Sequence, residues 1–216
     1  MSNRISAIIL AAGESLRMGQ PKLLLPWGKS TVLGQVISIF SEAGVEEVIV
    51  VTGGAHEQVE NLVAQMAGKY PVRAEFNPVF AKTGMLGSIQ QGLRALTAPI
   101  TNPGGSQIKH QDPGNGTRAA LIGLGDQPQV QVETVRRICT AFLSTGAPLV
   151  IPSFQNQRGH PWLIASTLWN DFLLLPSSTT PRIFLNAHAR EVEYVPADAS
   201  ILQDLDTPEE YSRQRP

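Results

Sequence analysis

Two basic side chains, Arg17 and Lys22, lie in a short glycine-containing stretch directly after an apolar run. Gly13 and Gly19 flank Arg17, and glycine lets the backbone approach a ligand closely or adopt positive φ. Backbone N–H groups exposed in such a loop bind phosphate oxygens. Arg17 adds a planar fork of donors and Lys22 a mobile point charge. The pattern indicates phosphate binding, and the competing interpretation is a glycine-rich turn with two solvated cations.

Three carboxylates could complement such a loop. Asp126 follows the apolar run 119–124, and Asp204 and Asp206 precede a helix-start pattern near the end of the sequence. An acid at the carboxyl end of a central strand lies where open α/β sheets bind ligands, and its oxygen atoms suit Mg²⁺. Asp204 and Asp206 are two residues apart, so on an extended segment they share one face. The alternatives are a turn role for Asp126, since Pro128 follows it, and solvated turn acids for the other two.

Two common phosphate-binding loops are excluded. A P-loop requires GxxxxGK[ST]; Gly28, Lys29 and Ser30 supply its ending, but Leu23 stands five residues before Gly28. The dinucleotide fingerprint GxGxxG is also absent after the first apolar run, because Gly13 is followed by glutamate and serine. The loop is therefore of a third kind.

The segment 10–22, LAAGESLRMGQPK, resembles the signature of the MobA-like nucleotidyltransferases, and within them that of the molybdenum cofactor cytidylyltransferase group. Further blocks resemble the same family in the same order: NPVFAKTGMLGSIQQGL at 77–93, GDQP at 125–128, RGHP at 158–161 and DLDTP at 204–208. The resemblance implies attack by an acceptor phosphate on the α-phosphorus of a nucleoside triphosphate, with release of pyrophosphate. Ala11-Ala12, where the related guanylyltransferases carry Gly-Gly, favours CTP with molybdopterin as acceptor, and makes a molybdoenzyme a candidate partner.

The resemblance also implies residue roles. Lys22, Arg17 and Asp126 are the expected catalytic residues, the two cations neutralising phosphate charge. Mg²⁺ is the expected cofactor, held by Asp126 with Asp204 or Asp206, of which Asp204 is slightly preferred. The nucleotide is expected to contact Leu10, Ala11, Ala12, Gly13, Glu14, Ser15, Arg17, Lys22, Thr52, Gly53, Asn77, Gly84 and Ser88.

On the acceptor side the resemblance implies His160 and Arg182. Here the chain departs from the family, which carries a Gly-Asp-x-Gly-x-Arg element, because segment 177–182 reads SSTTPR and keeps only the arginine. The departure leaves the identity of the acceptor undetermined and does not affect the residues expected to bind the triphosphate. Two of the predicted site residues also have simpler interpretations. His160 could be a turn histidine ordered by Pro161, and Ser88 could be a hydroxyl on a helix surface.

Apolar periodicity predicts the elements that must position these residues. Strands are expected at 5–10, 46–51, 72–76, 119–124, 148–153, 162–164 and 191–195, and a loop at 77–84. Helices are expected at 30–43, 56–66, 85–96, 132–143, 167–174 and 180–187, and after Thr207. The alternation predicts a three-layer α/β/α fold with a Rossmann-like, mostly parallel sheet, its short apolar strands buried on both faces. The resemblance specifies the nucleotide-diphospho-sugar transferase type.

Length and composition set the remaining limits. At 216 residues one domain is expected. Segment 98–117, rich in Gly and Pro, is expected to be a mobile loop or insertion, either filler, which is favoured, or a flap over the acceptor. A net charge of −1 gives no global field for nucleic acid or membrane. The single cysteine, Cys139, excludes an internal disulfide framework and fits a helix core. With no targeting or membrane-spanning pattern, a cytoplasmic location is expected.

Three other functions are compatible with parts of the sequence. One is nucleotidyl transfer to another phosphorylated acceptor, such as a sugar phosphate. Another is a non-catalytic chaperone that binds a pterin or nucleotide, against which the retention of Arg17, Lys22 and Asp126 argues. The third is a Rossmann oxidoreductase, which lacks its fingerprint.

Overall fold

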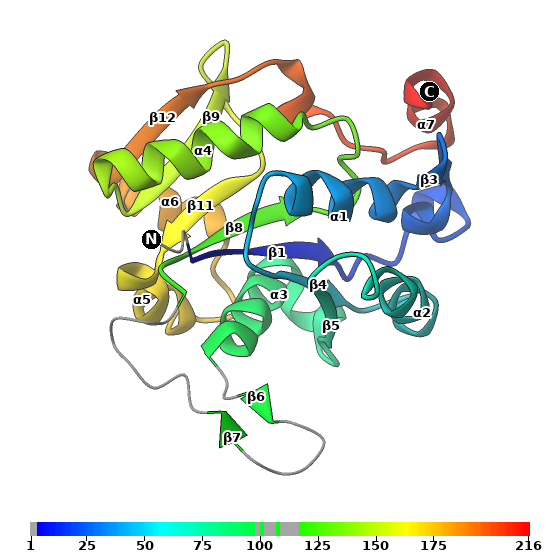
Figure 1. The fold of residues 1–216 in the computed structure, drawn as a ribbon, viewed down its shortest axis with the longest axis horizontal. Helices are drawn as coiled ribbons and strands as arrows, with labels where there is room; N and C mark the ends of the chain where they lie inside the picture. The colour runs from blue at the N-terminus through cyan, green and yellow to red at the C-terminus, as the bar shows by residue number, and fades with distance from the viewer. Residues whose placement is uncertain (1–3, 98–99, 102–106, 109–116) are drawn as a thin grey trace.

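A computed structural model describes residues 4–97, 100–101, 107–108 and 117–216 (Figure 1). One eight-stranded sheet runs through the molecule in the order β10-β9-β11-β8-β1-β4-β5, with β12 paired to β9. Its strands are β1 (Ile5–Ala11), β4 (Val48–Thr52), β5 (Val72–Phe76), β8 (Ala119–Leu124), β9 (Leu149–Phe154), β10 (Gln157–Arg158), β11 (Trp162–Ala165) and β12 (Val192–Pro196). The pairs β1–β4, β1–β8, β4–β5 and β9–β12 are parallel, whereas β11 and β10 run antiparallel to their neighbours.

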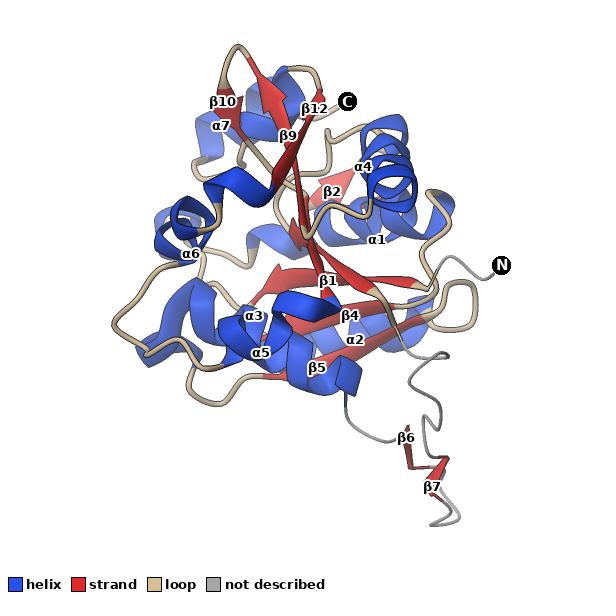
Figure 2. Cartoon of the chain, turned by 90° about the vertical axis from the view of Figure 1, so that its left-hand side faces the viewer, coloured by secondary structure: helices blue, strands red, loops and turns tan. Residues whose placement is uncertain are grey.

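Helices cover both faces of this sheet (Figure 2). They are α1 (Val32–Glu42), α2 (His56–Met66), α3 (Phe80–Thr97), α4 (Val132–Thr145), α5 (Trp169–Leu173), α6 (Pro181–Ala187) and α7 (Pro208–Gln214). The apolar residues of α1, α2 and α4 share one core, and those of α3, α5 and α6 share the other. The three-layer α/β/α architecture with a mostly parallel sheet is therefore confirmed.

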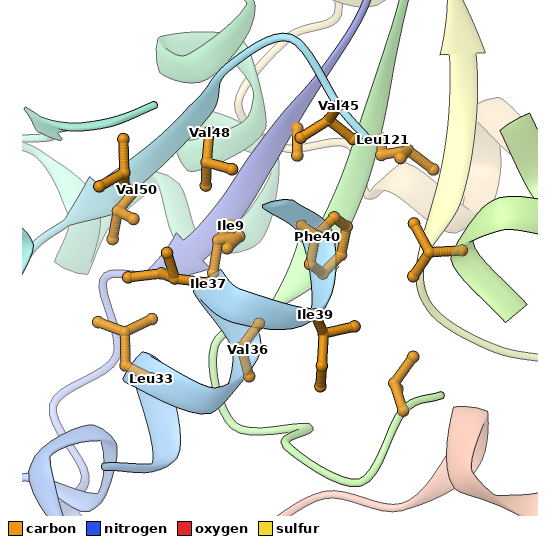
Figure 3. Packing of buried hydrophobic residues seen from close by; sticks show 14 of the residues in the cluster. Ile9, Leu33, Val36, Ile37, Ile39, Phe40, Val45, Val48, Val50 and Leu121 are labelled. Carbon is orange, nitrogen blue, oxygen red and sulfur yellow. The ribbon is translucent and has the colours of Figure 1, made fainter. Parts of the chain in front are cut away.

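The central strands are buried on both faces because their side chains alternate between the two cores. Ile9 and Val48 belong to the core under α1, whereas Ile8 and Ile49 belong to the core under α3. Figure 3 shows Leu33, Val36, Ile37 and Phe40 of α1 packed toward the side chains of β1, β4 and β8. The i, i+3, i+4 spacing that predicts this helix thus forms its buried stripe.

The N-terminus of α1 carries the capping residue that the sequence offers. The Thr31 side chain accepts a hydrogen bond from the N–H of Gly34 at 3.0 Å, which satisfies a donor the helix leaves free. Before it lies a hairpin of β2 (Pro26–Trp27) and β3 (Ser30–Thr31), turned at Gly28 with φ of +57°. The turn signal at 27–28 is therefore correct, and the two short strands are an addition.

Helix α3 differs from the sequence-based expectation. Residues 80–83, predicted as loop, form a helical turn, and the helix breaks at Gly84, whose φ is 56° and ψ −147°. Asn77 starts this turn by accepting a hydrogen bond from the N–H of Val79 at 3.2 Å. Only glycine adopts the Gly84 backbone conformation without strain, so the sequence signal at this position marks a kink between two helical segments.

Segment 98–117 is expected to be a loop or insertion, and most of it lies outside the described residues. Its described parts include two short strands, β6 (Ile100–Thr101) and β7 (Gln107–Ile108), which pair antiparallel. Among the described residues, no helix combines the length and apolarity that crossing a membrane requires.

Candidate active site

The loop after β1 and the acid after β8 leave the same edge of the sheet. Leu10 of β1 pairs with Leu124 of β8, and the N–H of Gly125 donates to the Leu10 carbonyl at 3.0 Å. A Cβ at Gly125 would lie 3.0 Å from that same oxygen, so the glycine permits the close approach. Asp126 is thereby placed beside the loop that holds Lys22, as the parallel pairing predicts.

Lys22 joins two of the three predicted acids. Its Nζ donates to Asp126 Oδ2 at 2.5 Å and to Asp206 Oδ1 at 2.8 Å, although the two acids lie 104 and 184 residues away in the chain. The Lys22 side chain is 13% exposed and that of Asp126 18%, so solvent screens the pair less than it would at the surface. The Lys22 N–H also donates to Ser15 Oγ at 3.2 Å, which ties the loop to its own start.

Arg17 completes the charged group from the rim of the site. Its Nη2 lies 2.7 Å from Asp206 Oδ2, with 70% of the arginine side chain exposed. An exposed pair of this kind contributes little to stability, and the guanidinium keeps donors available for an incoming anion. Asp206 is therefore shared by a partly buried lysine and an exposed arginine.

The charges of the group shift its pKa values in a consistent way. Burial acts to lower the pKa of Lys22, but the charge and hydrogen bond of Asp126, together with those of Asp206, outweigh it and the pKa is raised. The hydrogen bond from Lys22 lowers the pKa of Asp206, with Arg17 adding to the effect. The lysine and Asp206 are therefore held in their charged forms at neutral pH.

The tail of the chain positions Asp206 through a capping box. Thr207 caps α7 by accepting from the N–H of Glu210 at 3.2 Å, and the Glu210 carboxylate accepts from the N–H groups of Asp206 and Thr207 at 3.0 Å each. The Tyr211 hydroxyl then donates to the Pro26 carbonyl at 2.6 Å, which fixes α7 against the β2–β3 hairpin. The capping signal was readable from the sequence, but the tyrosine contact was not.

Asp204 has a different hydrogen-bond partner. Its Oδ1 accepts a hydrogen bond from Gln127 Nε2 at 2.7 Å. Burial raises the pKa of Asp204, the Gln127 hydrogen bond opposes that rise, and the neighbouring charge of Asp126 adds to it. Sequence reasoning missed the role of Gln127, whose one available signal was its place directly after Asp126.

The three acids do not form a complete cation site by themselves. Within the described ranges, no group of three or more His, Cys, Asp or Glu side chains is arranged to hold a metal ion. Instead the Lys22 ammonium lies between Asp126 and Asp206. Asp126 Oδ1, however, is buried without a hydrogen-bond partner among the described residues. An unsatisfied carboxylate oxygen of this kind suits a hard cation such as Mg²⁺, so Asp126 offers one oxygen ligand for such a cation.

A pocket of about 480 Å³ opens in front of these acids. Its walls include six residues predicted to contact a nucleotide: Leu10, Ala12, Gly13, Glu14, Gly84 and Ser88. Asp126, Asp204 and Asp206 also line it, and an adjoining hollow is lined by Ser15, Arg17 and Lys22. The structure thus brings most of the predicted nucleotide-side residues to one place.

A second pocket, of about 840 Å³, meets the first at Met85, which lines both. It contains His160 and Arg182, the two predicted acceptor-side residues, and Arg158. His160 is partly buried, with Nδ1 3.3 Å from the Ile122 carbonyl, and burial lowers its pKa. The neutral imidazole is thus favoured at physiological pH.

The model of the MobA-like NTP transferase domain family matches residues 7–192. The chain belongs to this family. It is a nucleotidyltransferase of MobA-like type, and the match includes the lysine loop, Asp126 and all the lining residues of the second pocket. Asp204 and Asp206 lie beyond the matched range.

Similar proteins span the same length. The molybdenum cofactor cytidylyltransferase of Escherichia coli is 27% identical over 96% of this chain and 93% of its own. A nucleotidyl transferase structure from Methanothermobacter is 26% identical with a TM-score of 0.73, covering 98% of this chain and 95% of that one. A Mycobacterium tuberculosis protein solved in complex with manganese has the same fold at 24% identity and a TM-score of 0.69, covering 99% and 98%.

One relative carries a different kind of name. The nicotine blue oxidoreductase of Paenarthrobacter nicotinovorans is 27% identical over 97% of this chain and 95% of its own. Proteins similar to this chain over most of its length are therefore named for different chemistries, and fold alone does not select the reaction.

Three residues predicted to contact the nucleotide are buried within the protein. Thr52 is fully buried and donates to Glu60 Oε1 at 2.8 Å, so its side chain faces α2. Gly53 is buried where a Cβ would lie 2.5 Å from the Ala12 carbonyl oxygen. Ala11 is buried within β1. These residues support the loop from inside the protein, because successive side chains of a strand point to opposite faces of the sheet.

Asn77 also acts from within the protein. It is 2% exposed, donates to Ser88 Oγ at 3.2 Å and accepts from the Val79 N–H. Ser88 in turn donates to the Gly84 carbonyl at 3.1 Å. Asn77 therefore fixes Ser88 and the kinked turn of α3, and Ser88 is the member of the pair that lines the pocket.

Proposed function

We propose that the chain transfers CMP from CTP to molybdopterin, with Mg²⁺ as the metal and pyrophosphate as the second product. The observation that carries the proposal is the contact of Lys22 with both Asp126 and Asp206 at the mouth of a pocket lined by the glycine-rich loop. A transferase of this kind has to neutralise triphosphate charge and align two anions. This group supplies both signs of charge at one point.

The chain's own residues account for binding and orientation. Lys22 and Arg17 neutralise the triphosphate oxygens, and backbone N–H groups of segment 12–15 hold the phosphate chain or the base edge. The acceptor phosphate oxygen bonds to the α-phosphorus as the bond from that phosphorus to the pyrophosphate oxygen breaks. An ionised phosphate attacks directly, so no covalent enzyme nucleophile is needed.

Asp126 is the first ligand that the geometry offers for Mg²⁺, with Asp206 or Asp204 as the second. The buried, unpartnered Asp126 Oδ1 supports this assignment. Bound Mg²⁺ supplies positive charge that stabilises the charge developing on the phosphates. The manganese reported with a Mycobacterium tuberculosis protein of the same fold is in keeping with a divalent cation.

The choice of CTP and molybdopterin is supported by likeness. Ala11-Ala12 and GDQP at 125–128 resemble the cytidine-using group, and the Escherichia coli relative is a molybdenum cofactor cytidylyltransferase. The missing Gly-Asp element at 177–182 separates this chain from the usual pattern on the acceptor side. A molybdoenzyme that receives the product is the partner that this function implies.

The test is incubation with molybdenum-loaded molybdopterin, Mg²⁺ and each of CTP, GTP and ATP, with product mass and pyrophosphate release measured. We expect molybdopterin cytosine dinucleotide with CTP and much less product with the purine triphosphates. Pyrophosphate release that requires a sugar phosphate instead would support the alternative acceptor class. Tight binding of nucleotide or pterin with no Mg²⁺-dependent turnover would support the chaperone alternative.

The oxidoreductase relative motivates one additional control. The same protein is incubated with NADH or NADPH and a quinonoid dye acceptor, and the nicotinamide absorbance is followed. Because the loop after β1 lacks GxGxxG, we expect no turnover of the nicotinamide cofactor. Catalytic oxidation of either cofactor, without nucleotidyl transfer, would replace the proposed function.

A further inference from the structure

The pocket beside the nucleotide site has an unusual balance of charge. Arg158 and Arg182 both line it, and the described residues of its wall include no aspartate or glutamate. Within the described part of the chain, neither arginine is in an ion pair. The whole sequence has 18 acids against 17 lysines and arginines. The positive charge of this pocket wall therefore comes from the local placement of two arginines and not from an excess of basic residues in the chain.

Arg158 is held in position before any ligand arrives. It lies in β10, directly after a tight turn in which Gln155 and Asn156 have φ of 49° and 63°. Its Nη1 donates to Asn186 Oδ1 at 2.9 Å, and its guanidinium lies 5.5 Å from the ring centroid of Tyr194. A neutral amide and an aromatic ring fix the fork without cancelling its charge.

Arg182 reaches the same pocket from a different element. It is the second residue of α6, after Pro181, and its side chain is exposed. Asn186, one turn further along α6, is the residue that holds Arg158. The β10 hairpin and the C-terminal end of α6 are thus joined by a hydrogen bond, and both arginines line the same cavity.

The two arginines lie outside the lining of the nucleotide pocket, where Asp126 and the lysine loop gather. An acceptor phosphate that attacks the α-phosphorus has to approach Asp126. A group bound by Arg158 and Arg182 is then a different part of the acceptor, across Met85, which lines both pockets. Planar guanidinium groups suit oxyanions because they donate paired hydrogen bonds.

We propose that Arg158 and Arg182 form an anion clamp that binds a second anionic group of the acceptor, distinct from its attacking phosphate. The acceptor class is a small molecule with a phosphate at one end and another oxyanion-bearing group at the other. The term acceptor rests on the proposed function, whereas the anion site stands on the pocket alone. A simple sugar phosphate offers no group for this clamp.

The clamp is tested first by binding of inorganic phosphate, with CTP present to occupy the lysine loop and no acceptor to permit turnover. Phosphorus NMR line broadening gives the affinity for wild type, Arg158→Gln, Arg182→Gln, the double variant and Arg94→Gln. Arg94 is an exposed arginine on α3 outside both pockets, so its variant controls for net charge. We expect at least about a tenfold loss with each clamp variant, the scale of one charge-assisted hydrogen bond, and no loss with Arg94→Gln.

Steady-state kinetics then separate the clamp from the nucleotide site. With an acceptor that carries two anions, Arg158→Gln should raise the acceptor KM about tenfold or more and leave the CTP KM unchanged. With a single-anion acceptor the same variant should have no effect. Equal phosphate affinity in wild type and the double variant, with the fold verified by circular dichroism, overturns the clamp.

The two proposals fail separately. If the protein binds no CTP, or turns over no phosphorylated acceptor, the proposed function is lost. In that case the phosphate affinities of wild type and the double variant still test whether the two arginines bind an anion. Arg158→Lys adds a check on mechanism, because it keeps the charge but not the planar fork, and should recover only part of the affinity.

Discussion

The ammonium of Lys22 lies 2.5 Å from Asp126 Oδ2 and 2.8 Å from Asp206 Oδ1, joining the loop after β1 to the end of β8 and to the tail. A single positive group thus lies between the two carboxylates that the proposed function assigns to the metal. A cation held by Asp126 and Asp206 would therefore compete with Lys22 for these two side chains. Triphosphate offers Lys22 a replacement anion, so nucleotide and metal are expected to bind cooperatively.

This competition predicts that Lys22→Met binds Mn²⁺ more tightly than wild type when no nucleotide is present. The substitution removes the ammonium that the cation has to displace while keeping the length of the side chain. Titration of free Mn²⁺ by electron paramagnetic resonance measures the affinity. Weaker or unchanged binding in the variant would show that Lys22 does not occupy the metal position.

Gln127 is expected to position Asp204, because its Nε2 holds Asp204 Oδ1 at 2.7 Å. Gln127→Leu should lower kcat about tenfold or more, the loss expected when one charge-assisted hydrogen bond is removed. Gln129→Leu is the matched control, since Gln129 holds the same tail through the Gln203 carbonyl and not through a carboxylate. Equal kcat losses in both variants would mean that only docking of the tail matters.

The two tail acids should affect stability with opposite signs at neutral pH. Lys22 lowers the pKa of Asp206, so its ionised form stabilises the fold above the ordinary pKa of 3.8, and that contribution is lost as pH falls through the lower folded value. Burial raises the pKa of Asp204, so stability is lost as pH rises from the ordinary value of 3.8 through the raised folded value, and the whole cost is present above it.

Urea unfolding at pH 7 and at about pH 3 measures this difference. At pH 7, Asp206→Asn should lower the free energy of unfolding and Asp204→Asn should raise it. Both differences should shrink at about pH 3, because this pH lies below the ordinary pKa of 3.8: the contribution of ionised Asp206 is then being lost, and Asp204 is protonated in the folded and largely in the unfolded chain. The same sign for both variants at pH 7 would contradict the arrangement around Lys22.

The sequence predicts the order of helices and strands well because that information is local. The short continuous apolar run around Ile9 and the i, i+3, i+4 stripe from Leu33 to Phe40 each specify an element. The parallel order of the strands then places the loop of Lys22 and Asp126 at one sheet edge. The convergence of the charged group follows from topology that the pattern already implies.

Side-chain direction is where the sequence is weaker. Thr52 ends a strand beside the site, yet its hydroxyl faces Glu60 of α2, and this depends on tertiary packing. Asp204 and Asp206 share a sequence motif, but one meets Gln127 and the other Lys22. Arg158 lies in the RGHP segment, where only the histidine is predicted to have a role. Its place in the same pocket as Arg182 depends on the β10 hairpin folding against α6.

The central claim is that Lys22 and Asp126 act together on one triphosphate, and turnover of CTP with Mg²⁺ and molybdopterin tests it most directly. Lys22→Ala and Asp126→Ala should each lower kcat at least about 100-fold, the scale of losing one transition-state charge contact. Lys29→Ala, which removes the exposed lysine of the incomplete P-loop pattern, should leave kcat unchanged. Near-normal kcat in either of the first two variants, with the fold intact, would contradict the account.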